Sequence, residues 1–394
     1  MRDFLEIFHW LLYYNPMNVY FDNAASTMVR CEAVDAMQRV MNEGYGNPSS
    51  MHHFGRIAAK SLADAREGLA GALGAKPENV FFTSGGTEAN NWAIFGATDV
   101  LTRKGKHIIT SVIEHSAVLD PIKKLESKGW EATYLHPDAA GRIPADAFSA
   151  ALREDTVFAS IMLVNNETGA VNPINDYSNA IKRRGFNAVL HTDAIQGLCK
   201  IPFTVNSLGA GLVTVSSHKL HGPKGVGALY VKDGVKLAPL ILGGSHEKGN
   251  RGGTEALPAA VGFGLAARLG SSELESTASA VRELRKYVIE MLKVEIPDVV
   301  FIGEGDSPFI LSLSLPFHKA EVLMNYLDGE GICVSRSAAC KKGARSRTLE
   351  AMGLKNEVID GALRVSFSRY NTKEEAEYFV KTLKKASVTL LKAL

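Results

Sequence analysis

Short apolar runs alternate with helix-like stretches from about residue 80 to residue 231, and this alternation restricts the possible folds most. The helix-like stretches include residues 88–101 and 117–127. Alternation of this kind is typical of a mainly parallel sheet covered by helices on both faces, in which ligands bind beyond the carboxyl ends of the strands. The runs, rich in β-branched and aromatic residues, predict strands at 80–83, 107–110, 132–135, 158–164, 189–192, 212–215 and 226–231.

The pattern changes after about residue 255. Apolar side chains recur at helical spacing over residues 273–294, which predicts a long amphipathic helix. Further strands are expected at 309–315, 332–334 and 363–367, and further helices at 320–327 and 373–391. We therefore expect a large domain over residues 31–270 and a smaller α+β domain over 271–394. The N-terminal segment 17–30 is expected to be part of the smaller domain.

The overall composition excludes several classes of protein. A net charge of +2 over 394 residues argues against direct nucleic-acid binding, which usually needs a strongly basic domain. The cysteines, Cys31, Cys199, Cys333 and Cys340, are too few for a disulfide framework in so long a chain, and no C-x-x-C pair points to zinc. We expect no metal and a reducing, cytoplasmic setting.

The first sixteen residues are rich in apolar side chains but also contain Asp3 and Glu6. They lack the basic start and small-residue cleavage site of a secretory signal, and they are shorter than the ~20 residues that a membrane span needs. Two interpretations are open: these residues form a short amphipathic helix, or they result from a start codon upstream of a natural beginning at Met17. We expect an N-terminal extension over 1–16, with no targeting role and no membrane association.

A lysine stands in a polar turn between two of the predicted strands. Ser216, Ser217, His218 and Lys219 follow the run at 212–215. A lysine where a buried strand ends loses part of its hydration, which favours the neutral amine that can form a Schiff base. The neighbouring hydroxyls and imidazole could hold a phosphate, so the set suits pyridoxal phosphate. An ordinary polar turn explains the same residues equally well.

Polar residues also follow other predicted strands. The segment 83–90 joins a strand to a helix, and its glycines, its free N–H groups and the hydroxyl of Thr87 suit an anion, although plain N-capping is an alternative. Asp193 could pair with a protonated pyridine nitrogen, and Gln196 could donate a hydrogen bond to the ring hydroxyl. A helix N-cap is the alternative for Asp193.

Three more residues have the chemistry of a binding site. His115 could stack on a flat cofactor and move protons near neutral pH, or could be a structural histidine. The amide of Asn166 could reach the cofactor or a substrate carboxylate, or could serve the turn alone. Arg364 could bind a carboxylate through two hydrogen bonds, although a surface arginine on a strand is common.

Cys340 lies among small residues and cations, in a segment that reads as a loop. Neighbouring positive charge lowers the pKa of a thiol and raises its thiolate fraction. A reactive role is therefore favoured over an inert one for Cys340. Cys31, Cys199 and Cys333 stand in apolar helical or strand contexts, and for these the inert interpretation is favoured.

Taken together, these segments resemble the NifS-like cysteine desulfurases of the class V aminotransferase group. The resemblance covers nearly the whole chain apart from residues 1–16. It implies the α/β architecture of a fold-type I pyridoxal phosphate-dependent transferase, with a mainly parallel seven-stranded sheet, helices on both faces and a smaller α+β C-terminal domain. The matching stretches, in order, are 21–27, 46–50, 83–90, 114–115, 164–169, 191–196, 216–227 and 251–254.

The resemblance implies a role for each candidate residue. Lys219 would form the Schiff base, Asp193 would face the pyridine nitrogen, and His115 would stack on the ring. Arg364 would hold the substrate carboxylate together with Asn166. The other cofactor contacts would be Gly86, Thr87, Ser216 and His218 at the phosphate, Thr254 from the partner subunit of a homodimer, and Asn166 and Gln196.

The implied reaction converts L-cysteine to L-alanine. Cysteine would replace Lys219 on the cofactor, and the freed amine and His115 would move protons. The Cys340 thiolate would then attack the substrate sulfur and keep it as a persulfide. A sulfur-acceptor protein of iron–sulfur cluster assembly or tRNA thiolation would receive it.

The sequence departs from the resemblance around Cys340. Relatives with a long mobile loop usually carry Ser-Gly-Ser-Ala-Cys followed by small hydroxyl residues, whereas here Arg-Ser-Ala-Ala-Cys is followed by Lys341 and Lys342. This leaves the acceptor and the reach of the loop open. The alternatives are a selenocysteine lyase or another class V lyase or aminotransferase, and a sulfur-carrier or scaffold protein with a vestigial site.

Overall fold

The computed structural model describes residues 18–337 and 345–391. The expected N-terminal extension over 1–16 and the candidate nucleophile Cys340 lie outside the described residues. The described chain forms two compact units: a larger one of residues 26–165 and 170–275, and a smaller one of residues 18–25, 166–169 and 276–391. The domain bounds expected from the sequence stay a prediction, and each unit is described by itself.

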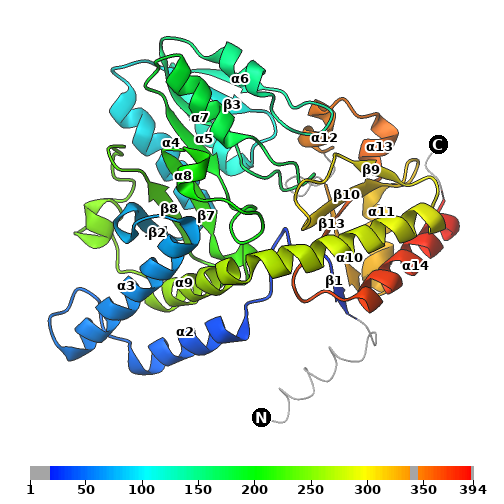
Figure 1. Ribbon diagram of the computed structural model, residues 1–394, viewed down its shortest axis with the longest axis horizontal. Helices are drawn as coiled ribbons and strands as arrows, with labels where there is room; N and C mark the ends of the chain where they lie inside the picture. Colours follow the sequence, from blue (N-terminus) through cyan, green and yellow to red (C-terminus); the bar gives the residue numbers. More distant parts are fainter. Residues whose placement is uncertain (1–17, 338–344, 392–394) are drawn as a thin grey trace. The chain divides into compact units, whose positions relative to one another are not determined.

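A seven-stranded sheet forms the centre of the larger unit (Figure 1). Its strand order is β2-β8-β7-β6-β5-β3-β4, and only β8 runs antiparallel to its neighbours within it. This confirms the expected mainly parallel, seven-stranded sheet. The strands are β2 Val80–Thr83, β3 His107–Ser111, β4 Glu131–Leu135, β5 Thr156–Ser160, β6 Val189–Asp193, β7 Leu212–Ser216 and β8 Gly227–Val231.

The strand expected at residues 158–164 differs most from its observed bounds. β5 ends at Ser160, although Ile161 and Leu163 still donate their N–H groups to His191 O and Asp193 O of β6. The chain leaves the ladder because Val164 forms a bridge to Val171 instead. The following turn therefore begins closer to the sheet than the apolar run suggests.

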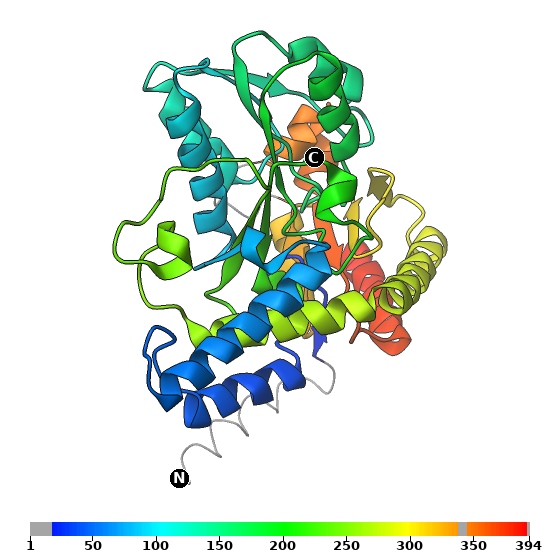
Figure 2. The same ribbon diagram turned by 60° about the vertical axis from the view of Figure 1, so that its left-hand side comes forward.

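Helices cover both faces of the large sheet. Phe81 packs against Trp92 of α4 (Gly86–Leu101) with ring centroids 5.5 Å apart, and Phe82 packs against Phe263 of α9 (Leu257–Ser272) at 6.4 Å. Successive side chains of a strand point to opposite faces, so α4 and α9 lie on different faces. Figure 2 shows α2 (Cys31–Glu43), α3 (His53–Leu73) and α9 running beside one another. The other helices are α5 Ser116–Glu126, α6 Ala145–Ala151, α7 Ile174–Arg183 and α8 Val205–Leu208.

A buried histidine joins three strands of this sheet. His191 of β6 has Nδ1 2.8 Å from Ser160 Oγ of β5 and Nε2 3.0 Å from Thr214 Oγ1 of β7. Burial lowers the pKa of His191 to about 3, because no counter-charge compensates the lost hydration of an imidazolium. The ring is therefore neutral at physiological pH and serves as a polar cross-link inside the sheet.

The smaller unit contains an antiparallel sheet of order β12-β13-β10-β9 and a parallel pair, β1 with β11. Every element expected between residues 273 and 391 is present within two residues of its predicted ends. The strands are β1 Val19–Tyr20, β9 Val300–Ile302, β10 Ile310–Ser314, β11 Ile332–Cys333, β12 Ser335–Arg336 and β13 Ala362–Ser366. The helices are α10 Leu274–Glu295, α11 Ala320–Gly329, α12 Arg347–Ala351, α13 Asn356–Asp360 and α14 Lys373–Thr389.

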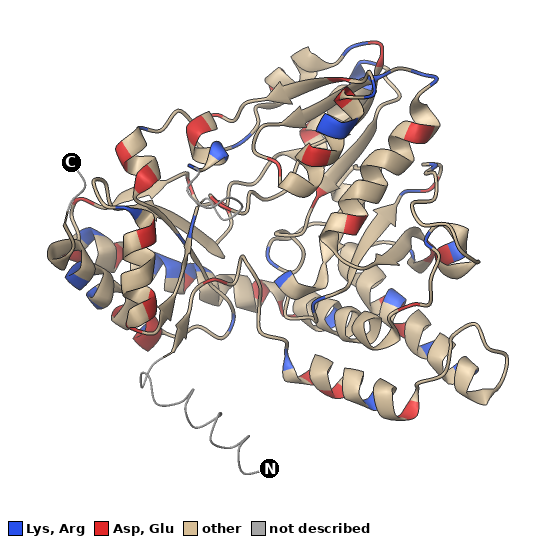
Figure 3. Ribbon diagram, turned by 180° about the vertical axis from the view of Figure 1, so that it is seen from behind, with Lys and Arg blue, Asp and Glu red and all other residues tan. Residues whose placement is uncertain are grey.

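Charged side chains of both signs are interspersed along the helices of each unit (Figure 3), in keeping with the net charge of +2. A membrane-crossing helix would have to be both long and continuously apolar. Within residues 18–337 and 345–391, no helix meets both conditions.

Candidate active site

Lys219 ends a short 3-10 turn, Ser217–Lys219, that directly follows β7. Thr27 fixes the backbone of this turn on both sides of the lysine. Its N–H and its hydroxyl donate to His218 O at 2.9 Å and 3.0 Å, and its Oγ1 accepts from His221 N–H at 2.8 Å. Thr27 precedes His218 by 191 residues. The turn that carries Lys219 is thus held by a distant segment of the chain.

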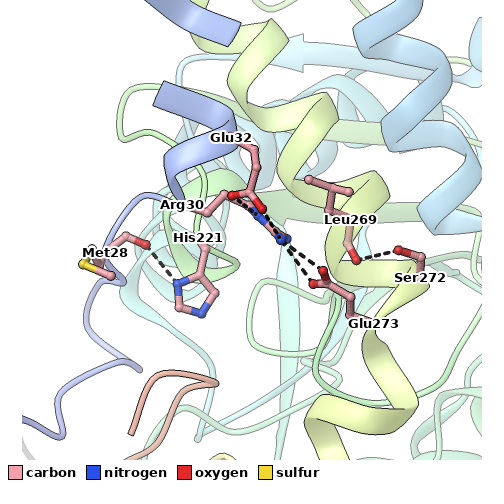
Figure 4. A network of polar contacts seen from close by, with 7 residues as sticks. All are labelled: Met28, Arg30, Glu32, His221, Leu269, Ser272 and Glu273. Carbon is pink, nitrogen blue, oxygen red and sulfur yellow. Dashed lines mark hydrogen bonds and ion pairs between the residues drawn. The ribbon is translucent and has the colours of Figure 1, made fainter. Parts of the chain in front are cut away.

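The segment that contains Thr27 is itself anchored by a buried arginine (Figure 4). The Arg30 guanidinium pairs with Glu32 at 3.3 Å and with Glu273 at 3.2 Å, and the Arg30 N–H donates to His221 O. His221 has φ +67°, a left-handed conformation that is uncommon for a residue with a side chain. Its N–H, its C=O and its Nδ1, 2.9 Å from Met28 O, are all engaged, which stabilises that conformation.

Asp193 ends β6 and is buried, with a side chain oriented by two hydrogen bonds. Its Oδ2 accepts from Asn90 Nδ2 at 2.7 Å and its Oδ1 from Ile195 N–H at 3.0 Å. Burial raises the pKa of Asp193, and the two hydrogen bonds and the electrostatic influence of His115 and Lys219 oppose that shift. The structure therefore brings three candidate residues, Asp193, His115 and Lys219, within electrostatic reach of one another.

His115 has a structural role at one ring nitrogen. It is the N-cap residue of α5, and its Nδ1 accepts from Ala117 N–H at 3.1 Å. The hydrogen-bond pattern therefore assigns the proton of the neutral ring to Nε2. The exposed imidazole lines a cavity of about 390 Å³ together with Thr87. Helix capping thus fixes the ring and leaves Nε2 as its proton-bearing atom.

The anion site is expected at the first turn of α4. Its N-cap, Gly85, provides no side-chain cap for the first helical N–H groups. A Cβ atom at Gly86 would lie 2.2 Å from Ile195 Cδ1 and 3.5 Å from Ser216 Cβ. A side chain at this position would therefore require Ile195 to move, and glycine lets the helix N-terminus lie close to Ile195 and to the end of β7. Thr87 is exposed beside it.

His218 and Gln196 are two further candidates for contacts with the cofactor. His218 is half-buried, and burial together with Lys219, Lys224 and Lys200 lowers its pKa to about 4, so its ring is neutral at physiological pH. Gln196 is buried, and its Oε1 accepts from Lys200 Nζ at 2.8 Å.

Thr254 is exposed, and its segment is tied to the start of α4 by an ion pair. Arg251 Nε lies 2.9 Å from Glu88 Oε1. Glu88 Oε2 accepts from Ser84 N–H at 3.1 Å, so one carboxylate contacts both the residue before the helix and the segment of Thr254. The ion pair lowers the pKa of Glu88 against the opposing effect of burial, which keeps this carboxylate charged.

In the smaller unit, Arg364 and Asn166 lie together. Arg364 is 2% exposed, so the surface interpretation is wrong, and its Nη1 donates to Asn166 O at 3.1 Å. Beside them, Glu167 accepts from Thr348 Oγ1 at 3.0 Å and from Ser346 Oγ. Burial raises the pKa of Glu167.

Sequence reasoning missed Thr27, Arg30 and Lys200, and treated Asn90 only as the end of the anion loop. Thr27 belongs to a stretch that supports the resemblance, which is the one signal that could have drawn attention to it. Buried positions of Arg30 and Lys200 have no local signal, since both residue types are usually exposed.

Comparison with known proteins places this site in a family. Residues 19–379 match the aminotransferase class-V family. The cysteine desulfurase IscS of Dictyoglomus turgidum is 42% identical over 371 residues, which cover 93% of this chain and 94% of that protein. The cysteine desulfurase IscS of Methanosarcina thermophila is 40% identical over 363 residues, 91% and 89% of the two chains.

A solved structure agrees with the sequence relatives. A structure titled NifS-like protein matches with a TM-score of 0.90 and 36% identity, over 95% of this chain and all of its own. The chain therefore belongs to the class V aminotransferase family and, within that family, to the NifS-like cysteine desulfurases.

Proposed function

We propose that this cysteine desulfurase binds pyridoxal phosphate through Lys219 and uses it to convert L-cysteine to L-alanine. The observation that carries the proposal is the buried carboxylate of Asp193, since a buried charge needs a counter-charge such as a protonated pyridine nitrogen. We assign the phosphate to the first turn of α4, whose first N–H groups have no side-chain cap and whose Gly86 lies near Ser216. When bound, the cofactor supplies an electron sink for the bonds at the substrate α-carbon.

Other described residues are proposed to transfer protons and to bind the substrate carboxylate. The Lys219 amine would hold the cofactor and would also accept and return a proton at Nζ. His115 moves a second proton at Nε2, because Nδ1 is occupied by the Ala117 N–H. The buried Arg364 holds the substrate carboxylate, and Asn166 supports Arg364 through its carbonyl oxygen.

Sulfur transfer is assigned to Cys340 from the sequence. Lys341 and Lys342 follow it directly and favour the thiolate. The thiolate attacks the substrate sulfur, so that an S–S bond forms while the C–S bond breaks. The electron pair of the C–S bond stays on the substrate carbon, whose protonation gives the methyl group of alanine. The persulfide on Cys340 is then passed to a thiol of a sulfur-acceptor protein.

Mass spectrometry of the protein after incubation with cysteine tests this proposal. We expect a mass increase of one sulfur atom on Cys340 and release of alanine. Lys219→Ala should lose the visible absorbance of bound cofactor, whereas Cys340→Ser should keep that absorbance and form no persulfide. Full turnover by Cys340→Ser would refute the assignment of the nucleophile. Alanine release from selenocysteine but not from cysteine would favour a lyase.

We also propose that the chain forms a homodimer. Exposed apolar side chains support this, since large exposed apolar areas usually mark an interface. Met51 between α2 and α3 is 91% exposed, Leu242 is 82% exposed, and the stacked rings of Tyr45 and Phe54 are also accessible. A second copy of the chain would cover these side chains and would supply Thr254 to the phosphate of its partner.

Mixing two inactive variants tests the dimer. Lys219→Ala and a Thr254 variant that has lost cofactor binding should each be inactive alone. If Thr254 serves the site of the partner, a mixed dimer places both lesions in one site and leaves the other site intact. Recovery of about a quarter to a half of the wild-type activity after subunit exchange is expected. No recovery, with mixed dimers demonstrated by mass, would place both residues in the same subunit's site.

The proposal also includes the cellular compartment and the protein that accepts the sulfur. The described cysteines, Cys31, Cys199 and Cys333, are unpaired, which supports a reducing cytoplasmic setting. The acceptor is proposed to be a protein of iron–sulfur cluster assembly or of tRNA thiolation. Incubation of persulfide-loaded protein with each acceptor class, followed by mass analysis of the acceptor, separates the two.

A further inference from the structure

A buried lysine contacts one of the residues proposed to bind the cofactor. Lys200 Nζ lies 2.8 Å from Gln196 Oε1, and both residues are buried, Lys200 with 6% of its surface exposed. They stand four positions apart in the tight turns that follow β6, where Gly197 and Leu198 both donate their N–H groups to Ala194 O. Burying an ammonium is costly, so the position of Lys200 calls for an explanation.

The contact decides which way the amide of Gln196 faces. An ammonium group can only donate hydrogen bonds, whereas an amide has one accepting oxygen and one donating nitrogen. If the amide turned over, its NH₂ group would meet the ammonium and two donors would face each other. Lys200 therefore holds Oε1 on its own side and turns Nε2 away. Low local polarity strengthens this preference, because water cannot substitute for either partner.

We propose that Lys200 is a positioning residue that fixes Gln196 so that Nε2 presents its N–H groups to the ring hydroxyl of pyridoxal phosphate. The inference rests on the proposed function, because it deepens the binding of the same cofactor. An N–H donor aimed at the ring oxygen stabilises negative charge there and adds affinity. Loss of Lys200 removes the hydrogen bond that holds Oε1 on the side of Lys200, and we expect the contribution of Nε2 to weaken even though Gln196 is still present.

A purely electrostatic role for Lys200 can be separated from this orientation. The charges of Lys200 and Lys224 both act on His218 and help to lower its pKa. Lys224 is exposed, whereas the Lys200 ammonium is buried and hydrogen-bonded to Gln196. Lys224→Met is therefore the matched control for Lys200→Met, since it removes a neighbouring charge and leaves the amide contact intact.

A double-mutant cycle on cofactor affinity tests the proposal. Pyridoxal phosphate is titrated into cofactor-free protein and followed by visible absorbance. Lys200→Met and Gln196→Leu should each weaken binding by roughly tenfold, the worth of about one hydrogen bond. The double variant should bind no more weakly than the weaker single variant, because both changes remove the same interaction. Lys224→Met should stay within about twofold of wild type.

If Lys200→Met folds poorly, two conservative variants still test whether Lys200 orients Gln196. Lys200→Arg retains a group that only donates and should restore affinity to within about threefold of wild type. Gln196→Glu keeps the partner of Lys200 but has no N–H to donate, and should bind as weakly as Gln196→Leu. Thermal unfolding of the cofactor-free variants reports stability separately.

The outcomes distinguish the inference from the proposed function. Wild-type protein that binds no pyridoxal phosphate would refute the cofactor assignment and, with it, the role of Lys200. Wild-type binding with Lys200→Met unchanged, or with losses that multiply in the double variant, would refute the positioning role alone. An equal loss in Lys224→Met would assign the effect to charge instead of orientation.

Discussion

Arg364 and Asp22 form an ion pair inside the smaller unit, with Arg364 Nη2 2.8 Å from Asp22 Oδ1. The arginine side chain is only 3% exposed, and its Nη1 donates to Asn166 O. Its Nε, also buried, has no hydrogen-bond partner among the described residues. One carboxylate and one carbonyl therefore hold the plane of the guanidinium. Such a group is prepared to bind a further carboxylate.

Arg364→Lys should weaken substrate binding much more than it slows the reaction. An ammonium cannot reproduce the planar set of donors that Asp22 and Asn166 hold in place. The KM for cysteine should rise by about 10- to 100-fold, the equivalent of a hydrogen bond to a charged group, with a smaller change in kcat. Alanine release measured against cysteine concentration gives both constants. Arg369→Lys, an exposed position in the same unit, is the control, and an unchanged KM in Arg364→Lys would rule out the assigned contact.

Asn90→Ala should weaken cofactor binding through Asp193. The Asn90 amide donates to Asp193 Oδ2 at 2.7 Å, and its loss raises the pKa of a carboxyl that burial already raises. A larger fraction of Asp193 would then be protonated and unable to pair with a pyridinium. Pyridoxal phosphate affinity should fall by about tenfold, and the loss should grow as the pH is lowered. Titrations of Asn90→Ala at several pH values, with Asn175→Ala on α7 as control, measure this, and a loss independent of pH would contradict the mechanism.

The fold could be predicted from the sequence because its signals are local. Each strand of the large sheet is a short run of β-branched and aromatic residues, and polar residues mark the strand ends where ligands bind. Lys219, Asp193 and His115 could therefore be proposed as site residues, because each lies at the end of a strand or a few positions after it, and their roles stay predictions. In the large sheet the bounds of β5 were misjudged most, since an apolar run does not show where its backbone leaves the ladder. The short strands β1, β9 and β12 of the smaller unit were not expected.

The supporting residues could not be predicted because their partners are distant in sequence. Asn90 contacts Asp193 across 103 residues and Thr27 contacts His218 across 191. Nothing in a local pattern distinguishes such a side chain from an ordinary cap or turn residue. His115 illustrates a second limit, since its ring caps α5 and is also suited to catalysis, and the sequence offered these as alternatives.

His191 should make stability depend on pH. Its pKa is about 3 in the folded protein and about 6.5 in an unfolded chain. Above pH 6.5 both states are neutral; below it the unfolded state binds a proton that the folded state does not. Stability should therefore fall as the pH drops from about 6.5 toward 3, by up to about 1.4 kcal/mol per pH unit from this group.

Urea unfolding at several pH values measures this contribution. His191→Gln keeps one donor and one acceptor for Ser160 and Thr214 but does not titrate. The variant should lose less stability than wild type between pH 7 and pH 5, whatever its stability at pH 7. His136→Gln, an exposed position, should follow the wild-type dependence. Parallel pH dependence in His191→Gln and wild type would contradict the low pKa.

Glu167→Ala should slow sulfur transfer and leave cofactor binding intact. The half-buried Glu167 accepts hydrogen bonds from Ser346 Oγ and Thr348 Oγ1. Ser346, the N-cap of α12, in turn accepts from Leu349 N–H through Oγ. Ser346 stands six positions after Cys340 in the sequence. Without the carboxylate, two buried hydroxyls lose their acceptor and the start of α12 loses the contact that fixes it beside Asn166.

The rate of persulfide formation on Cys340 should therefore fall by about 5- to 20-fold, the cost of one to two hydrogen bonds. Mass spectrometry of samples quenched at successive times gives that rate, and visible absorbance gives cofactor occupancy. Glu350→Ala, an exposed carboxylate on the same short helix, is the matched control. A parallel fall in occupancy would show a general loss of structure, because the residues proposed for the Schiff base, the ring and the phosphate lie in the larger unit, whereas Glu167, like Asn166, lies in the smaller one. An unchanged persulfide rate would show that the start of α12 does not need this carboxylate to bring Cys340 to its substrate.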